Sequence, residues 1–292
     1  MVLIYKVNKG ENMDIVNRIA IVTGGGGNIG RHIALKLAEN GAAVAVVDCI
    51  RGTADETVRL IRAAGGRATA FVTDVSDYAS VKECFHEIVA HFGVVDYLIT
   101  AAGGSTRSHM TTLARQSPEI ITENIGVNMF GALWFAKETA AYFESGFNAD
   151  NNPCRGEIAD SRGEIADKIG EAHAPGKPTG GRIVFIASIL GIDGREGCVE
   201  YSAAKGGIIA MSKSLAKELG HLGVTVNCVS PGLVNRPNDT TDVRGTNFLN
   251  ELCTADDIAE AVMYLVGESG RFVTGHNLIV DGGRSLGLKG VK

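Results

Sequence analysis

Short apolar runs alternate with segments of helical periodicity along most of this chain. The run RIAIVT at residues 18–23 predicts a buried strand, and residues 28–40 predict a helix whose apolar face ends before Gly41. The same pair of signals recurs several times. Such alternation is typical of parallel strands whose connecting helices cover both faces of one sheet. The sequence therefore predicts an α/β fold with a doubly wound, three-layer parallel sheet.

The same signals locate the other elements. Further strands are expected at residues 42–48, 67–74, 95–104, 181–188, 224–230 and 276–283. Further helices are expected at residues 53–66, 78–93, 119–143, 201–220 and 255–267. Thr53 is the expected N-cap of its helix, because a threonine hydroxyl can accept a hydrogen bond from the free amides of a first turn.

Two segments depart from this alternation. Residues 144–180 are polar and contain the hexapeptide RGEIAD twice, at residues 155–160 and 162–167. Two copies are too few for a solenoid, so we expect a surface insertion, with an oligomer or substrate contact as the alternative. Residues 1–14 precede the first strand and are expected to form a flexible extension. Residues 15–292 are then expected to form a single domain that carries the insertion.

Composition and charge exclude several classes of function. The net charge of −5 disfavours a nucleic-acid-binding surface, and no apolar run approaches the ~20 residues that span a bilayer. The six cysteines include no C-x-x-C pair and the seven histidines no H-x-x-x-H pair, so no metal site is expected. Scattered thiols suit a reducing compartment. We expect a cytoplasmic protein with neither a nucleic-acid nor a membrane partner.

A glycine-rich run, VTGGGGNIG, joins the first strand to its helix. It fits two patterns, G-x-G-x-x-G through Gly25, Gly27 and Gly30, or T-G-x-x-x-G-x-G through Thr23, Gly24 and Gly30. In the second pattern Asn28 stands where a glycine is usual. A glycine turn ahead of a helix lets backbone N–H groups approach a diphosphate. Taken alone, the run is also compatible with a plain tight turn.

An acid at the end of the second strand strengthens the case for a dinucleotide site. Asp48 lies 18 residues beyond Gly30, near the spacing expected for the group that binds the ribose hydroxyls of NAD. A carboxylate there repels the 2′-phosphate of NADP. Arg51 is a counter-signal, since a cation at this ribose would favour NADP. We expect NAD in preference to NADP.

A serine, a tyrosine and a lysine farther along the chain indicate catalysis. Ser188 ends the strand expected at 181–188, and Tyr201 and Lys205 lie one helical turn apart in YSAAK. A free phenol has a pKa of ~10 and is a poor base at neutral pH. A neighbouring ammonium favours the phenolate and lowers that pKa, and Ser188 can donate a hydrogen bond to the substrate oxygen.

Together these residues resemble the short-chain dehydrogenase/reductases (SDRs), over about residues 15–283 apart from the insertion. The resemblance implies a Rossmann-type sheet and a nicotinamide dinucleotide. It implies that Tyr201 is the general acid/base, that Ser188 orients the reacting oxygen, and that Lys205 binds the nicotinamide ribose and tunes Tyr201. Asn128 would complete a proton relay to Lys205 through water. It also suggests a homotetramer or homodimer that assembles through the long helices and the last strand.

Further positions match the cofactor site of the family. Asp74 and Val75 correspond to the segment at the adenine, and Pro231 and Gly232 to the wall of the nicotinamide pocket. The resemblance also selects the T-G-x-x-x-G-x-G pattern, with Asn28 as its one substitution. The cofactor-binding residues that it implies are Gly24, Asn28, Ile29, Gly30, Asp48, Asp74, Val75, Ala102, Gly103, Tyr201, Lys205, Pro231, Gly232 and Val234.

The chain departs from the family pattern at two places. The N-N-A-G that usually follows the fourth strand is TAAG here, with Thr100 and Ala101 in place of the asparagines. A local rearrangement or a water has to replace the lost hydrogen bonds. Arg236 stands where a threonine usually meets the nicotinamide carboxamide, and its side chain can reach the diphosphate, an acidic substrate or solvent. The substrate lid that follows it is short and polar.

The resulting hypothesis is an NAD-dependent oxidoreductase that interconverts a secondary alcohol and a ketone by hydride transfer. A 3-oxoacyl-thioester reductase that uses NADPH is the alternative within this class. A dinucleotide-binding sensor or scaffold without catalysis is the alternative of another class. The TAAG segment and Arg236 motivate the sensor, whereas the intact Ser188, Tyr201 and Lys205 oppose it.

Overall fold

The computed structural model describes residues 15–104, 110–147, 180–236 and 245–287. The N-terminal extension expected at residues 1–14 lies outside these ranges. So does nearly all of the insertion expected at residues 144–180, including both copies of RGEIAD.

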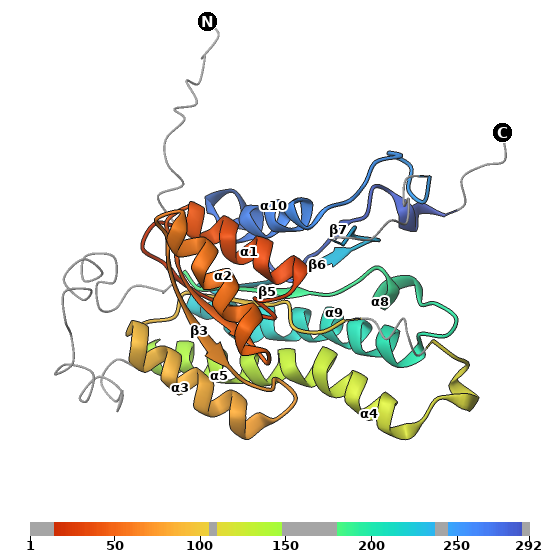
Figure 1. Ribbon diagram of the computed structural model, residues 1–292, viewed down its shortest axis with the longest axis horizontal. Coiled ribbons are helices and arrows are strands. Elements are labelled where there is room, and N and C mark those ends of the chain that lie inside the picture. The colour runs from red at the N-terminus through yellow and green to blue at the C-terminus, as the bar shows by residue number, and fades with distance from the viewer. Residues whose placement is uncertain (1–14, 105–109, 148–179, 237–244, 288–292) are drawn as a thin grey trace, which may run out of the picture.

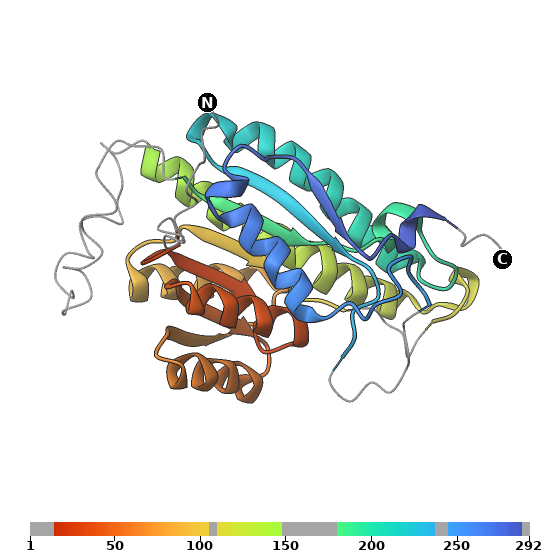
Figure 2. The same cartoon turned by 90° about the horizontal axis from the view of Figure 1, so that it is seen from above.

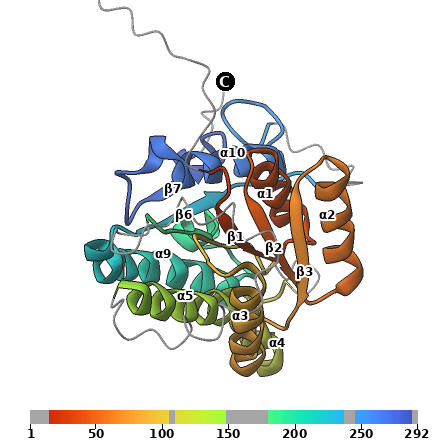
Figure 3. The ribbon, with the colours of Figure 1, turned by 90° about the vertical axis from the view of Figure 1, so that its left-hand side faces the viewer.

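Seven parallel strands form one sheet in the order β3-β2-β1-β4-β5-β6-β7. The chain runs outward from β1 to β3, returns to β4 beside β1, and continues from there to β7 at the other edge (Figure 3). The carboxyl ends of β1 and β4 therefore flank the switch point at which a ligand crevice opens. The strands are β1 (Ile19–Thr23), β2 (Ala43–Asp48), β3 (Arg67–Val72), β4 (Tyr97–Thr100), β5 (Arg182–Ile186), β6 (Thr225–Pro231) and β7 (Asn277–Val280).

Helices cover both faces of this sheet (Figures 1 and 3). Strand residues alternate between two buried clusters: Ile21 packs with the helices of one face, whereas Val22 packs with those of the other. The first face carries α3 (Tyr78–Phe92), α5 (Gly131–Phe147) and α9 (Val199–Leu219). The second face carries α1 (Asn28–Glu39), α2 (Arg51–Ala63) and α10 (Ala255–Val266). The predicted doubly wound, Rossmann-type α/β fold is confirmed.

Shorter helices connect these elements. They are η2 (Leu113–Arg115), α4 (Pro118–Ile125), η3 (Gly126–Phe130), α8 (Leu190–Asp193), η5 (Gly220–Leu222), η6 (Glu268–Gly270) and η7 (Arg284–Leu286). Ser117 begins α4, because its hydroxyl accepts a hydrogen bond from the Ile120 amide and Pro118 occupies the first turn.

The helix predicted at residues 119–143 is not a continuous α-helix. Its middle, η3, is a π turn, which adds one residue to the turn around Asn128. The hydrophobic pattern could not show this, since one extra residue only shifts the phase of the apolar face.

The predicted cap of α2 is wrong. The helix begins two residues before Thr53, after Ile50, and the Thr53 hydroxyl donates to the Ile50 carbonyl oxygen at 2.9 Å. The Asp48 carboxylate accepts from the Ile50 amide at 3.0 Å, so a side chain ahead of the helix stabilises its start. Thr53 instead packs against Gly26 of the glycine run.

Candidate active site

The glycine run forms a tight loop at the carboxyl end of β1. Gly24 has a left-handed φ of 64°, and a Cβ there would lie 2.7 Å from the Cα of Ala102. A Cβ on Gly30 would overlap the carbonyl oxygen of Gly24. Gly27 is freer, with 3.2 Å to that same oxygen, although Gly25 is tight against Val46. The two glycines of T-G-x-x-x-G-x-G are thus both positions that tolerate no side chain.

The first turn of α1 opens into a cavity. Its N-cap is Gly27, no side chain caps it, and Asn28, Ile29 and Gly30 line the cavity. The amides of a first turn have no acceptor within their helix, so they can bind an anion such as a diphosphate. Asn28 fits without harming the loop, because its side-chain amide donates to the Asn235 carbonyl oxygen at 3.1 Å.

Asp48 and Asp74 bring negative charge to one end of this cavity, where β2 and β3 finish. The Asp48 carboxylate accepts from the Gly26 amide at 3.0 Å as well as from Ile50, so its orientation is set by backbone groups. Asp74 accepts from the Ser76 amide and hydroxyl at 2.9 and 2.7 Å. Arg51 is exposed in the first turn of α2, outside the set of residues that line the cavity.

Asn128 holds the segment in which the family asparagines are replaced. Its Oδ1 accepts from the Gly104 amide at 3.0 Å, and its Nδ2 donates to the Gly104 carbonyl oxygen at 3.2 Å and to the Asn124 carbonyl oxygen at 3.0 Å. Gly103 has a φ of 130° and lies against the same amide. The hydroxyl of Thr100 is buried without a hydrogen-bond partner in the described structure. Asn128 therefore supports the backbone at Gly104, just after the TAAG segment.

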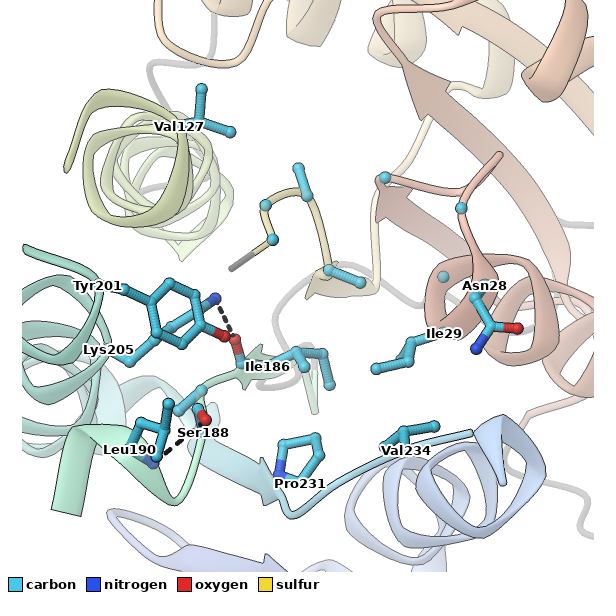
Figure 4. Close-up of a pocket in the computed structure, with 18 of the residues that line it drawn as sticks. Asn28, Ile29, Val127, Ile186, Ser188, Leu190, Tyr201, Lys205, Pro231 and Val234 are labelled. Carbon is cyan, nitrogen blue, oxygen red and sulfur yellow. Dashed lines mark hydrogen bonds between the residues drawn. The ribbon is translucent and has the colours of Figure 1, made fainter. Parts of the chain in front are cut away.

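Ser188, Tyr201 and Lys205 lie together on one side of the cavity, across from Asn28 and Ile29 (Figure 4). Ser188 follows β5, and its Oγ accepts from the Leu190 amide at 3.2 Å. The Lys205 ammonium is buried and donates to the Ile186 carbonyl oxygen at 3.0 Å. It lies 5.8 Å from the centroid of the Tyr201 ring. Burial lowers the pKa of Lys205 from 10.5 to about 8.

The segment after β6 forms the opposite wall. The Gly232 amide donates to the Val280 carbonyl oxygen at 2.9 Å, and a Cβ on Gly232 would lie 2.7 Å from the Asp281 side chain. Val234 forms an isolated bridge with Cys253. Arg236 is exposed and lines the cavity.

One cavity of about 680 Å³ collects nearly all of the predicted site residues. Asn128 is the exception, since it is buried behind Gly104 and contacts the cavity wall from outside. The sequence prediction missed several lining residues. Cys49 and Thr73 directly follow strand ends and could have been found on that ground, whereas no motif marks others. Those others are Met110, Val127, Leu190, Arg195, Leu233 and Arg284.

The described residues offer neither a cluster of metal ligands nor a helix that could span a membrane. Those residues contain no group of three or more histidine, cysteine or acidic side chains that could hold a metal ion. Within the same ranges, no helix has the length and apolar character needed to cross a bilayer.

Two family models together match most of this chain. Residues 18–150 match a family model described as short chain dehydrogenase, and residues 168–285 match one described as enoyl-(acyl carrier protein) reductase. The (2S)-[(R)-hydroxy(phenyl)methyl]succinyl-CoA dehydrogenase subunit BbsD of Thauera aromatica is 32% identical over 94% of this chain and 99% of its own length. A (3R)-3-hydroxyacyl-CoA dehydrogenase of Canis lupus familiaris is 31% identical over 91% of this chain and 95% of its own.

A solved structure has the same fold. It is a 3-ketoacyl-(acyl-carrier-protein) reductase from Brucella melitensis, complexed with NADH. It superposes with a TM-score of 0.76 at 25% identity, over 93% of this chain and 99% of its own.

Proposed function

The chain belongs to the short-chain dehydrogenase/reductase family and is an oxidoreductase, and from this premise we propose that it uses NAD to interconvert a secondary alcohol and a ketone. The observation that carries the proposal is the arrangement of Ser188, Tyr201 and Lys205 beside a glycine loop and Asp48 in one cavity. A nicotinamide dinucleotide, when bound, supplies or accepts the hydride.

Tyr201 is the proposed proton donor and acceptor. In the oxidative direction its phenolate takes the hydroxyl proton of the alcohol, and in the reductive direction its phenol returns a proton to the carbonyl oxygen. The Lys205 ammonium, 5.8 Å from the centroid of the Tyr201 ring, favours the phenolate, and with a pKa of about 8 it is mostly protonated at neutral pH. Ser188 donates to the same substrate oxygen and orients it. Asn128, which the structure joins to Gly104, is proposed to support the water that links Lys205 to solvent.

The proposed cofactor is NAD, with NADP disfavoured. The Asp48 carboxylate is held by the Gly26 and Ile50 amides at the end of β2, which suits the hydroxyls of an unphosphorylated ribose. A 2′-phosphate there would meet a fixed negative charge at short range. The exposed Arg51, outside the cavity, offers no compensation in this arrangement.

A 3-oxoacyl-thioester reductase that uses NADPH is the second candidate. The names of two relatives favour it, since one acts on a hydroxyacyl-CoA and another is a ketoacyl-carrier-protein reductase. Asp48 opposes the NADPH part of this candidate, but not the thioester.

We also propose a homodimer or homotetramer of single-domain subunits in the cytoplasm. A groove of about 380 Å³ lies between α5 and α9, with Leu133, Ala140, Met211 and Leu215 among its lining residues. At the sheet edge, Ile279 of β7 is 43% exposed. The described cysteines form no disulfide, which suits a reducing compartment.

Light scattering during size-exclusion chromatography measures the oligomeric state. A Leu215→Glu variant that keeps the oligomeric state of the wild type argues against a subunit contact through α5 and α9.

The deciding experiment is a spectrophotometric screen at about 340 nm, the nicotinamide absorbance. NAD⁺ and NADP⁺ are each titrated with polyols and cyclic alcohols as substrates, and NADH and NADPH are each titrated with simple ketones and 3-oxoacyl thioesters. Saturation at a lower concentration by the unphosphorylated cofactor, with turnover of a non-thioester alcohol or ketone, supports the proposal. Preference for NADPH with thioesters favours the second candidate. Binding of NADH with no turnover of any compound would point to the sensor or scaffold instead.

A further inference from the structure

The two ends of the cavity carry opposite charges. The acids among its lining residues, Asp48 and Asp74, both lie where β2 and β3 end. Three arginines, Arg195, Arg236 and Arg284, line it from the segments that follow β5, β6 and β7. The chain as a whole has a net charge of −5, so this gathering of cations is not a general property of the surface.

Arg195 and Arg284 belong to neighbouring segments at the substrate side. Arg195 lies in the turn between α8 and α9, and its carbonyl oxygen accepts from the Cys198 amide at 3.2 Å, just ahead of Tyr201. Arg284 begins η7 and donates one hydrogen bond to the Thr246 carbonyl oxygen at 2.8 Å. Figures 1 and 2 both show this dark-blue turn beside α8. Both residues line the cavity, Arg195 from the turn after α8 and Arg284 from the turn after β7.

No carboxylate of the described residues neutralises these guanidinium groups. Asp193 and Glu196 lie close to Arg195 in sequence, but neither forms an ion pair with it. Asp281 precedes Arg284 by three residues, yet its two oxygens accept from the amides of Gly283 at 2.8 Å and Ser285 at 2.7 Å. Positive charge that lines a cavity without a carboxylate partner is available to an anionic ligand.

Arg236 lines the part of the cavity that is proposed to hold the cofactor. It follows Asn235, whose carbonyl oxygen accepts from the Asn28 side chain at the start of α1. This contact places Arg236 at the phosphate loop, within the part of the cavity that suits a diphosphate. The excess of positive charge at the substrate end thus comes from Arg195 and Arg284.

We propose that the substrate of this enzyme is a hydroxy or keto acid whose anionic group is bound by Arg195 and Arg284 while its carbinol or carbonyl carbon faces Tyr201. The inference rests on the proposed oxidoreductase function and names the substrate class. A guanidinium binds a carboxylate through two parallel hydrogen bonds, so this pair would both attract the acid and set its orientation.

The test compares a keto acid with its neutral methyl ester, which carries the same ketone group. With NADH as cofactor, 4-oxopentanoate is measured against methyl 4-oxopentanoate, and acetoacetyl-coenzyme A serves as a third probe whose anion is phosphate. The wild type is expected to favour the anionic probe in kcat/KM by roughly 10- to 100-fold, the range for hydrogen bonds to charged groups. Arg195→Gln and Arg284→Gln should each remove most of this preference, because kcat/KM should fall much more for the acid than for the ester. Arg195→Lys should keep part of the preference for the acid, because lysine keeps the positive charge but cannot form the two parallel hydrogen bonds of a guanidinium.

Arg59→Gln is the matched control, since Arg59 is exposed on α2, pairs with Glu56 and lies outside the cavity. If none of the probes is turned over, calorimetric titration of the same probes into the NADH-bound protein decides. Acid-selective binding without turnover would retain the inference and reject the proposed interconversion of an alcohol and a ketone. Equal values for acid and ester in the wild type, or a preference that survives both glutamine variants, would overturn the inference, even if the ketones are reduced.

Discussion

The two halves of the cavity are built in different ways. Around β1, β2 and β3 the walls are mostly backbone: Gly24 and Gly30 let chain segments touch, and the Gly26 and Ile50 amides hold Asp48. Around β5, β6 and β7 the walls are side chains, including Tyr201, Arg195 and Arg284, borne by turns and a helix. A half made of backbone serves one ligand shape, whereas a half made of side chains can change its ligand by substitution. The first half is suited to a common cofactor and the second to a particular substrate.

The largest effect is expected in the second half, from Tyr201→Phe. Loss of the phenolic hydroxyl removes the proposed proton donor and acceptor, so kcat should fall by roughly 10²- to 10⁴-fold. The Kd for NADH should stay within a few-fold, because the ring and Lys205 remain. Stopped-flow turnover and fluorescence titration of NADH measure the two quantities. A variant that keeps its turnover would show that Tyr201 is not the acid/base, and the assignment of the catalytic group to the second half would then be wrong.

The next effect is expected in the first half, from Gly24→Ala. A left-handed φ costs an L-residue about 1–2 kcal/mol, and the methyl group would also collide with the backbone of Ala102. Urea unfolding should show a loss of roughly 2–4 kcal/mol in the free energy of unfolding, together with weaker NADH binding. Gly65→Ala is the control, since Gly65 has a φ of 84° and no neighbour within 4 Å of the new methyl. Equal losses in the two variants would mean that the close approach at Gly24 is unimportant.

Asp48→Asn tests whether the backbone-built half selects the cofactor by charge. The amide keeps an oxygen for a backbone N–H but removes the negative charge that faces the ribose. The ratio of kcat/KM with NADH to that with NADPH should fall by about tenfold, mostly through the KM for NADPH. Asp55→Asn, on the exposed face of α2, should leave this ratio unchanged. If Asp48→Asn also leaves the ratio unchanged, another group discriminates between the cofactors.

A further effect concerns the Lys205 ammonium, which lies 5.8 Å from the centroid of the Tyr201 ring. Burial lowers the pKa of Lys205 from 10.5 in the unfolded chain to about 8 in the fold, so between these values the unfolded state holds a proton that the folded state has lost. Stability attributable to Lys205 therefore rises with pH in this window, by about 1 kcal/mol per pH unit, and its burial penalty is fully present below pH 8. In thermal unfolding from pH 7 upward, the Tm of the wild type should rise relative to that of Lys205→Met. The Tm of Lys217→Met, a substitution at an exposed position on the same helix, should change with pH as the wild type does. Parallel curves for wild type and Lys205→Met would contradict the lowered pKa.

Sequence alone predicted the backbone-built half well, because glycine patterns report directly on close approaches. The strand–helix alternation located all seven strands, and the T-G-x-x-x-G-x-G pattern identified Gly24 and Gly30 before their conformations were known. The assignment of Thr53 as a cap was wrong, since the competing acceptor, Asp48, comes from outside the helix window.

The side-chain half was predicted where a spacing rule or the family resemblance applied. Tyr201 and Lys205 are one turn apart on a helix, and that periodicity survives in the sequence. Arg195 and Arg284 come from turns that are distant along the chain, and only the folded sheet brings them to one cavity. The support of Gly104 by Asn128 was likewise hidden, because it depends on the π turn between α4 and α5.

That π turn also constrains how this chain can tolerate deletions. An α-helix turns by about 100° per residue, so the extra residue in Gly126–Phe130 offsets the face of α4 from the face of α5 by that angle. Removing one residue would make a straighter helix, but it would turn either Asn128 away from Gly104 or the apolar side of α5 away from the sheet. The extra residue of η3 thus sets the relative orientation of two helix surfaces that have different partners. A helix without this residue could replace it only if both surfaces were rebuilt at once.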